Sequence, residues 1–306
     1  MTDMPLKIKT VSAKRGNLLY RDGFWAAIML LPNLIGFMMF LFIPIVAAFV
    51  LSFMEYDVIS PMKFIGLSNY IEMFHDPIVA ETLRNTVVYT VIVVPSGMAL
   101  SLILALALDQ NIAGRRIFRA VYFLPSITSM VAVAVVWQWI YNPEFGLLNY
   151  LLSLFDIDGP AWLSSSKTSL LSIAIVGIWK GMGYNMLLFL AGLQGISTSY
   201  YEAAKLDGAN AFQEFIHITF PMLRPTTFFI FIMSIIGSFQ VFDSVMLMTS
   251  GEPGRSSSVL VHYLYQNAFE YFRMGYACAI AYLLFFIVVT LTLINLRMEK
   301  STMSMY

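Results

Sequence analysis

The sequence predicts an all-α polytopic membrane protein with six transmembrane helices. Of its 306 residues 59% are hydrophobic and only 12% are charged, whereas soluble domains carry about 25% charged residues. Six apolar segments each reach the ~20 residues that a helix needs to cross a bilayer. Because the bilayer core offers no water to backbone groups, and the period of two expected of barrel strands is missing, these segments are expected to be helices. They comprise residues 24–53, 83–108, 117–141, 168–193, 226–248 and 276–297.

The first apolar segment follows a polar, basic tail, residues 1–23. A secretory signal peptide would place only about 7–15 apolar residues after such a tail, whereas this segment is much longer, although Pro32 and Pro44 interrupt it. We therefore predict an uncleaved first span. Pro95 and Pro125 lie inside the second and third segments, where a kinked helix tolerates proline if neighbouring helices pack against it.

The distribution of basic residues predicts that both chain ends lie in the cytoplasm. With that orientation twelve Lys and Arg residues fall inside, five fall outside, and Lys180 lies within a span. This excess agrees with the rule that cytoplasmic segments are the more basic ones. The polar stretch 194–225 is then cytoplasmic. The outer loops are about 54–82, 142–167 and 249–275.

A helix–glycine–helix element is predicted in the cytoplasmic stretch. Residues 199–202 read Ser-Tyr-Tyr-Glu and fit a capping box, in which the Ser and Glu side chains bond the first free N–H groups of a helix. Gly208 stands where such a helix would end, because glycine adopts the left-handed cap conformation at no steric cost. A second helical stretch, residues 210–220, is expected to stop at Pro221.

The alternative for this element is an amphipathic helix that lies on lipid headgroups. Such a helix carries Lys and Arg on its polar face. The stretch instead offers three acidic residues against one lysine and one histidine, a balance that favours a protein partner over anionic lipid. These residues are Glu202, Asp207, Glu214, Lys205 and His217.

The sequence contains no motif for catalysis or for binding of a cofactor or metal. No phosphate-binding G-x-x-x-x-G-K-[ST] loop, H-E-x-x-H helix or G-x-S-x-G turn occurs. His75, His217 and His262 stand on different segments, and the single Cys278 excludes an intrachain disulfide. A formal net charge of zero gives no indication of a nucleic-acid partner.

Two ionisable residues are expected inside the membrane. Lys180 lies near the middle of the fourth segment, where a charged group costs ~2.5–3.5 kcal/mol. Asp243 lies near the outer end of the fifth, roughly 10 Å away in depth at the helical rise of 1.5 Å per residue. Both side chains line a solute path in one interpretation; in the other, Lys180 is an interhelical strut and Asp243 a helix-end cap. The aromatic, amide and hydroxyl groups beside them suit a sugar, and equally suit helix packing. These neighbours are Trp179, Tyr184, Asn185, Gln240 and Ser244.

The cytoplasmic element carries a sequence pattern that resembles a known motif. Glu202-Ala203-Ala204, followed by Gly208, Ile218 and Pro221, resembles the EAA motif of inner-membrane permease subunits of binding-protein-dependent ABC importers. In that family the short helix docks into a cleft on the ATP-hydrolysing subunit and passes its motion to the membrane helices. The resemblance implies that the residues at or near this contact are Glu202, Ala203, Ala204, Asp207, Gly208, Phe215 and Pro221.

Other stretches narrow the resemblance to permeases that import carbohydrates, in particular to the first permease of maltose-type and oligosaccharide systems. These stretches are residues 64–70, 123–126, 137–143, 146–149, 239–243, 249–254 and 274–277. The resemblance implies a type I ABC importer permease fold. The domain would span residues 24–300, with its core at 83–297, the coupling helix at about 199–220, and tails at 1–23 and 301–306.

The function implied by this resemblance is ATP-driven uptake of a carbohydrate, an oligosaccharide, in the cytoplasmic membrane of a prokaryote. Implied partners are a second permease, which in this family is usually a different chain, two ATPase subunits that hold ATP and Mg²⁺, an extracytoplasmic sugar-binding protein and the lipid bilayer. The resemblance leaves the sugar open. Two other classes stay open on the residues alone, namely an ion-coupled secondary transporter and an intramembrane enzyme.

Overall fold

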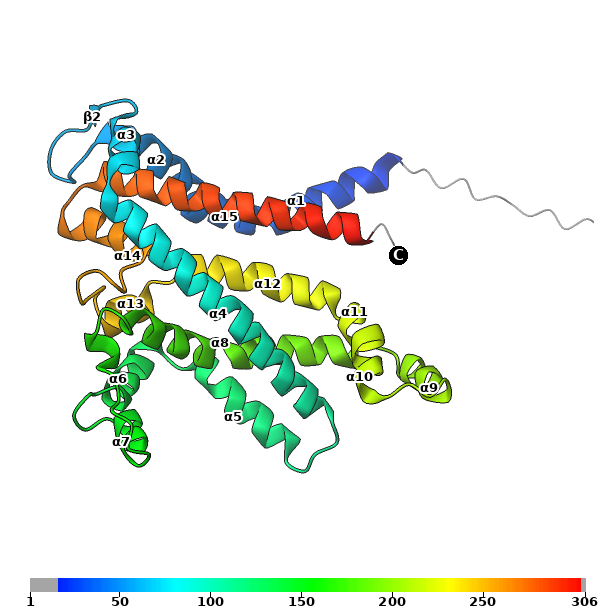
Figure 1. Ribbon diagram of the computed structural model, residues 1–306. Coiled ribbons are helices and arrows are strands. Elements are labelled where there is room, and N and C mark those ends of the chain that lie inside the picture. Colours follow the sequence, from blue (N-terminus) through cyan, green and yellow to red (C-terminus); the bar gives the residue numbers. More distant parts are fainter. Residues whose placement is uncertain (1–15, 304–306) are drawn as a thin grey trace, which may run out of the picture. The chain divides into compact units, whose positions relative to one another are not determined.

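The computed structural model describes the backbone of residues 16–303 and is almost entirely helical (Figure 1). Residues 1–15 of the predicted N-terminal tail and 304–306 of the C-terminal tail lie outside the described residues. The chain divides into two compact units, with the boundary between Leu51 and Ser52. Each unit is described by itself.

The first unit is one helical rod. It consists of α1 (Gly16–Phe37), the π-helical turn η1 (Met38–Phe42) and α2 (Ile43–Leu51). Pro44 cannot donate a hydrogen bond to the carbonyl four residues earlier, and the wider π-helical turn ends two residues before it. The stretch Trp25–Leu51 is long and apolar enough to cross a membrane, in agreement with the predicted first span.

The second unit starts with an antiparallel hairpin, β1 (Met54–Glu55) and β2 (Lys63–Phe64), in which Met54 is opposite Phe64. Then come α3 (Ser68–His75) and the long α4 (Pro77–Asp109), which starts at a proline because the first turn of a helix needs no N–H donor. The other elements are α5 (Arg115–Ile127), α6 (Met130–Ile140), α7 (Leu147–Ser153), the 3-10 turn η2 (Trp162–Ser164), α8 (Ser169–Gln194), α9 (Thr198–Leu206), α10 (Ala211–Glu214), the π-helical η3 (Phe215–Thr219), α11 (Phe220–Met222), α12 (Arg224–Phe239), α13 (Asp243–Met248), α14 (Leu260–Tyr265), the π-helical η4 (Gln266–Glu270) and α15 (Met274–Met303).

Within the described residues, four helical stretches are long and apolar enough to cross a membrane, and the number is six if each of two bent helix pairs forms one span. The four are Trp25–Leu51, α4, α8 and α15 as far as Arg297. The bent pairs are α5 with α6, at 99°, and the stretch Ala211–Met222 with α12, at 63°. The larger number equals that of the six predicted spans, but the second bent pair covers residues 211–239 and so begins within the stretch predicted to be cytoplasmic.

The third span is not the single helix that its apolar run predicts, because α5 ends at Ile127 and α6 leaves it at 99°. Thr128 has an extended backbone at this break. Hydroxyl groups compete for the last carbonyls of α5, since Ser126 donates to Phe123 O (2.6 Å) and Thr128 to Leu124 O (2.9 Å). Pro125 also lacks the N–H that would continue the helical ladder.

The fifth span is likewise interrupted, and the prediction of one helix over 226–248 is wrong. Helix α12 ends at Phe239, and α13 begins only at Asp243. The hydroxyl of Ser238 bonds back to Ile235 O (2.9 Å) in the last turn of α12, a contact that competes with the helical ladder. Because Val241 and Phe242 in the gap are apolar, hydropathy alone does not reveal the break.

Two of the three buried clusters of the second unit lie along α8. Helices α4 and α5 pack against α8 over much of its length. One buried cluster includes Tyr141, Ile173 and Val245, and a second one, farther along α8, includes Met186 and Phe189. The region around α13 lies toward one end of α8 and the region around α9 toward the other (Figure 1), so α8 connects the two regions.

Candidate functional site

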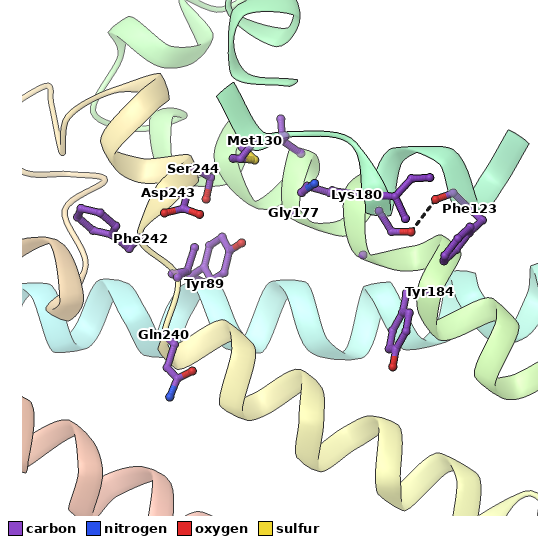
Figure 2. Close-up of a pocket in the computed structure, with 15 residues that line it drawn as sticks. Tyr89, Phe123, Met130, Gly177, Lys180, Tyr184, Gln240, Phe242, Asp243 and Ser244 are labelled. Atoms are coloured by element: carbon purple, nitrogen blue, oxygen red, sulfur yellow. Dashed lines mark hydrogen bonds between the residues drawn. The ribbon is translucent and has the colours of Figure 1, made fainter. Parts of the chain in front are cut away.

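A cavity of about 590 Å³ lies where the breaks of the third and fifth spans face α4 and α8 (Figure 2). Of the seven residues that the sequence suggests for a solute path, five line it, namely Lys180, Tyr184, Gln240, Asp243 and Ser244. Sequence reasoning missed other lining residues because they are apolar, small or on other spans. They include Tyr89, Phe123, Ser126, Met130 and Gly177.

Trp179 and Asn185, the two other suggested residues, are not among those that line the cavity. The Trp179 ring meets the edge of Trp137, with 5.5 Å between ring centroids, and packs against a buried cluster. The Asn185 amide donates to the hydroxyl of Ser234 at 3.4 Å and so links α8 to α12. Both residues serve helix packing, which is the alternative that the sequence left open.

Lys180 secures the bend of the third span. Its Nζ donates to Thr128 O (2.5 Å) and Pro125 O (3.2 Å), both at the end of α5. A helix C-terminus exposes carbonyl groups without helical partners, and the ammonium supplies donors to them. Within the part of the chain that the structure describes, no hydrogen bond or ion pair joins Lys180 to Asp243. The interhelical-strut interpretation of Lys180 therefore matches its contacts.

Asp243 begins α13, but its side chain does not cap the helix. The residue in the cap position is Phe242, and no side-chain hydrogen bond forms there. The Asp243 carboxylate is exposed and borders the cavity. Figure 2 shows its side chain close to those of Tyr89 and Ser244. Gln240 points away from them in the same view.

The small residue Gly177 makes room for Tyr89 at this wall. A Cβ atom on Gly177 would overlap the Tyr89 hydroxyl oxygen, which comes from α4. The close approach of α4 to α8 therefore depends on the lack of a side chain at Gly177.

The cytoplasmic element predicted from the sequence forms an exposed elbow of α9, Gly208, α10, η3 and α11. Gly208 has a φ angle of +80°, which confirms the predicted left-handed cap. The N-cap of α9 is Ser197, whose hydroxyl accepts from the N–H of Ser199 (3.4 Å), so the capping box predicted at residues 199–202 is wrong. A capping box does form one helix later, between Asn210 and Gln213.

The second helical stretch of the elbow does not stop at Pro221, as its sequence predicts. It continues to Met222, because the π-helical η3 changes the bonding pattern just before Pro221, which then occupies the first turn of α11. The Tyr201 hydroxyl is 2.9 Å from the Thr219 hydroxyl oxygen and ties α9 to η3. The elbow is thus a braced unit rather than a loose loop.

The exposure of the predicted coupling residues differs along the elbow. Glu202, Ala203, Asp207 and Gly208 are exposed, whereas Ala204, Phe215 and Pro221 are half-buried. Leu206 is 90% exposed and Phe212 is 71% exposed. The elbow therefore presents two large apolar side chains on its surface.

A helical membrane protein with a cavity at broken spans and an exposed elbow beyond their ends has the architecture of a transport permease. Residues 97–297 match the family described as "Binding-protein-dependent transport system inner membrane component". The chain is also 40% identical over 279 residues to the probable ABC transporter permease protein YurN of Bacillus subtilis (strain 168), a match that covers 90% of this chain and 95% of YurN. The chain belongs to this family of permeases.

Two further similarities bear on fold and substrate. The chain is 34% identical to the arabinooligosaccharides transport system permease protein AraP of Bacillus subtilis (strain 168), over 88% of this chain and 87% of AraP. A crystal structure of a bacterial ABC transporter involved in the import of the acidic polysaccharide alginate matches with a TM-score of 0.82. That match covers 93% of this chain and 99% of the other at 23% identity. It establishes the type I permease fold.

Proposed function

We propose that this chain is the permease subunit of an ATP-driven importer that takes up a carbohydrate, an oligosaccharide, delivered by an extracytoplasmic binding protein. One observation carries the proposal: the two helices that leave the elbow both lead to the cavity. Helix α8 precedes α9 and carries Gly177 and Lys180, and α12 follows α11 and ends next to Gln240. A force on the elbow therefore reaches two walls of the cavity through helices.

The ATPase is a separate subunit in this proposal, because the sequence has no phosphate-binding loop. The exposed residues Glu202, Ala203, Asp207 and Gly208 would contact it. The half-buried Ala204, Phe215 and Pro221 would hold the shape of the elbow. Two ATPase subunits would bind ATP and Mg²⁺, close on ATP binding, and move the elbows of two permeases so that the path opens outward.

The same proposal places the elbow and both chain ends in the cytoplasm and the β1–β2 hairpin outside. A second permease, which is a different chain in the usual arrangement of such importers, would complete the path. The cavity residues Lys180, Tyr184, Gln240, Asp243 and Ser244 would form this chain's side of it. The relative AraP, named for transport of arabinooligosaccharides, supports a sugar as the solute.

Substitution of Gly208 tests the proposal. A Cβ atom at Gly208 meets no atom within 4 Å, so any penalty comes from the backbone angle of +80°. A β-branched residue avoids this left-handed conformation, whereas asparagine tolerates it. We expect Gly208→Val to lower ATP-driven sugar uptake by proteoliposomes about tenfold, the factor that 1.4 kcal/mol represents.

The matched Gly208→Asn variant is expected to retain most of the uptake. Both variants should insert into the membrane to the same extent, which protease protection and expression levels can measure. Full uptake by Gly208→Val would contradict the coupling role of the elbow. Uptake that followed an imposed ion gradient without ATP would instead show a secondary transporter.

A further inference from the structure

The cavity has only two charged lining residues among those that the structure describes, Lys180 and Asp243. Lys180 is hydrogen-bonded to the protein backbone, whereas Asp243 is exposed. This difference bears on the charge of the solute, which relatedness does not settle. AraP is named for arabinooligosaccharides, whose hydroxyl groups carry no charge, whereas the transporter with the same fold imports an acidic polysaccharide.

The Lys180 ammonium is committed to the protein's own backbone. An ammonium group has three N–H donors, and Thr128 O and Pro125 O occupy two of them. The side chain is also half-buried. These two carbonyl oxygens therefore leave Lys180 at most one N–H donor for a solute.

The Asp243 carboxylate has no such commitment. Among the residues whose side chains the structure describes, 23 and 25–297, it has no hydrogen-bond or ion-pair partner, and it is exposed at the cavity wall. The side chains of Ser244 and Tyr89 lie beside it in Figure 2. A carboxylate only accepts hydrogen bonds, so Asp243 suits the O–H groups of a sugar and repels another anion.

We infer that the cavity is built for uncharged, hydroxyl-rich solutes, and that Asp243 discriminates against sugars that carry a carboxylate, sulfonate or phosphate group. The inference rests on the proposed function, because it assumes that the solute passes through this cavity. Lys180 acts as a positioning residue for the bend between α5 and α6. Asp243 is the specificity-determining residue on this chain's side of the path.

The test is a displacement measurement on the membrane complex of this chain with its second permease and ATPase subunits in nanodiscs. The binding protein is omitted, because its own specificity would mask that of the cavity. Labelled arabinotriose is displaced either by unlabelled arabinotriose or by trigalacturonate. We expect the concentration of trigalacturonate for half displacement to be at least about tenfold higher, since like charges repel strongly at a protein surface.

Two variants separate the charge in the cavity from charge elsewhere. Asp243→Asn keeps the shape of the side chain and removes its charge, so the two sugars should displace the label at similar concentrations. Asp158→Asn removes the same charge from an exposed loop position outside the cavity, so the wild-type ratio should persist. The wild-type ratio should also shrink at high ionic strength, because the screening length falls to about 3 Å in 1 M salt.

The outcomes distinguish this inference from the function on which it rests. Equal displacement by the two sugars in the wild type, an unchanged ratio in Asp243→Asn, or a ratio insensitive to salt would overturn the inference and leave the proposed function intact. If neither arabinotriose nor any other uncharged oligosaccharide binds to the wild-type complex, the inference is overturned, whereas the proposed function is decided separately by the ATP-driven uptake measurement. If Asp243→Asn loses binding of arabinotriose, the salt dependence of the wild-type displacement ratio still tests the inference.

Discussion

At the scale of single residues, two glycines of α8 lie close together in sequence but in very different surroundings. A Cβ atom on Gly183 would overlap the backbone oxygen of Tyr122, which belongs to α5. A Cβ atom on Gly181 would meet nothing within 4 Å. The backbones of α5 and α8 therefore touch at Gly183, and backbone atoms cannot turn aside as a flexible side chain could.

This contrast predicts opposite effects of the same substitution. Gly183→Ala should destabilise the protein by about 2 kcal/mol, because overpacking of a close contact costs about 1–3 kcal/mol. Gly181→Ala should be neutral or stabilising by about 0.5–1 kcal/mol, because alanine favours a helix interior over glycine. Thermal unfolding of the purified protein in one detergent measures both. Equal melting temperatures of the two variants would show that α5 and α8 do not pack as closely as described.

At the scale of helices, Asp76, which lies just before the candidate span α4, joins three helices. It is the N-cap of α4, where its Oδ1 accepts from the N–H of Ile78 (2.8 Å). Its Oδ2 accepts from the hydroxyl groups of Tyr263 in α14 and Tyr276 in α15, each at 2.7 Å. Burial by itself would raise the pKa of Asp76, but these hydrogen bonds outweigh it and hold the pKa below the ordinary 3.8.

A depressed pKa means that the folded protein favours the charged carboxylate. Its stabilising contribution is therefore fully present above the unfolded value of 3.8 and is lost as the pH falls through the lower folded value. We expect Asp76→Asn to lower the melting temperature at pH 7, and the gap to the wild type to narrow below about pH 4. The quantity to compare is the difference in melting temperature between variant and wild type, because the other carboxylates titrate in both proteins. A gap that widened in acid would contradict the assigned hydrogen bonds.

At the scale of the whole molecule, orientation in the membrane decides which surface an ATPase can reach. The proposed topology puts the elbow in the cytoplasm and the loop after α7 outside. Leu206 and Phe155 are suitable reporters, because they are 90% and 76% exposed in the two regions. Cys278, the single cysteine, is half-buried and would be replaced by alanine in the background.

In that background an impermeant maleimide added to intact spheroplasts should label Phe155→Cys. Leu206→Cys should react only after the membrane is permeabilised. Labelling of Phe155→Cys shows that the reagent is active, and labelling of Leu206→Cys after permeabilisation shows that this variant is expressed. Labelling of Leu206→Cys in intact spheroplasts would reverse the topology and remove the elbow from the reach of a cytoplasmic ATPase.

The sequence predicts well those features that depend on near neighbours in the chain. Gly208 is one example, because a left-handed helix end is a local property of glycine. The six apolar segments are another, since length and hydropathy alone identify them. Near neighbours also explain why α5 ends, through Pro125 and the hydroxyl groups of Ser126 and Thr128. They do not reveal that the carbonyls at this break are bonded by Lys180, which lies more than fifty residues later in the chain.

By itself, the sequence determined the class of this protein, its apolar segments, the position of the elbow and the absence of recognisable catalytic and phosphate-binding motifs, because composition and short motifs carry these properties. Only the tertiary structure decided that Lys180 serves the bend while Asp243 remains free at the cavity, and that Trp179 and Asn185 serve helix packing. The physical reason is that the use of a polar side chain depends on which carbonyl, hydroxyl or ring another helix brings within about 3 Å, the reach of a hydrogen bond.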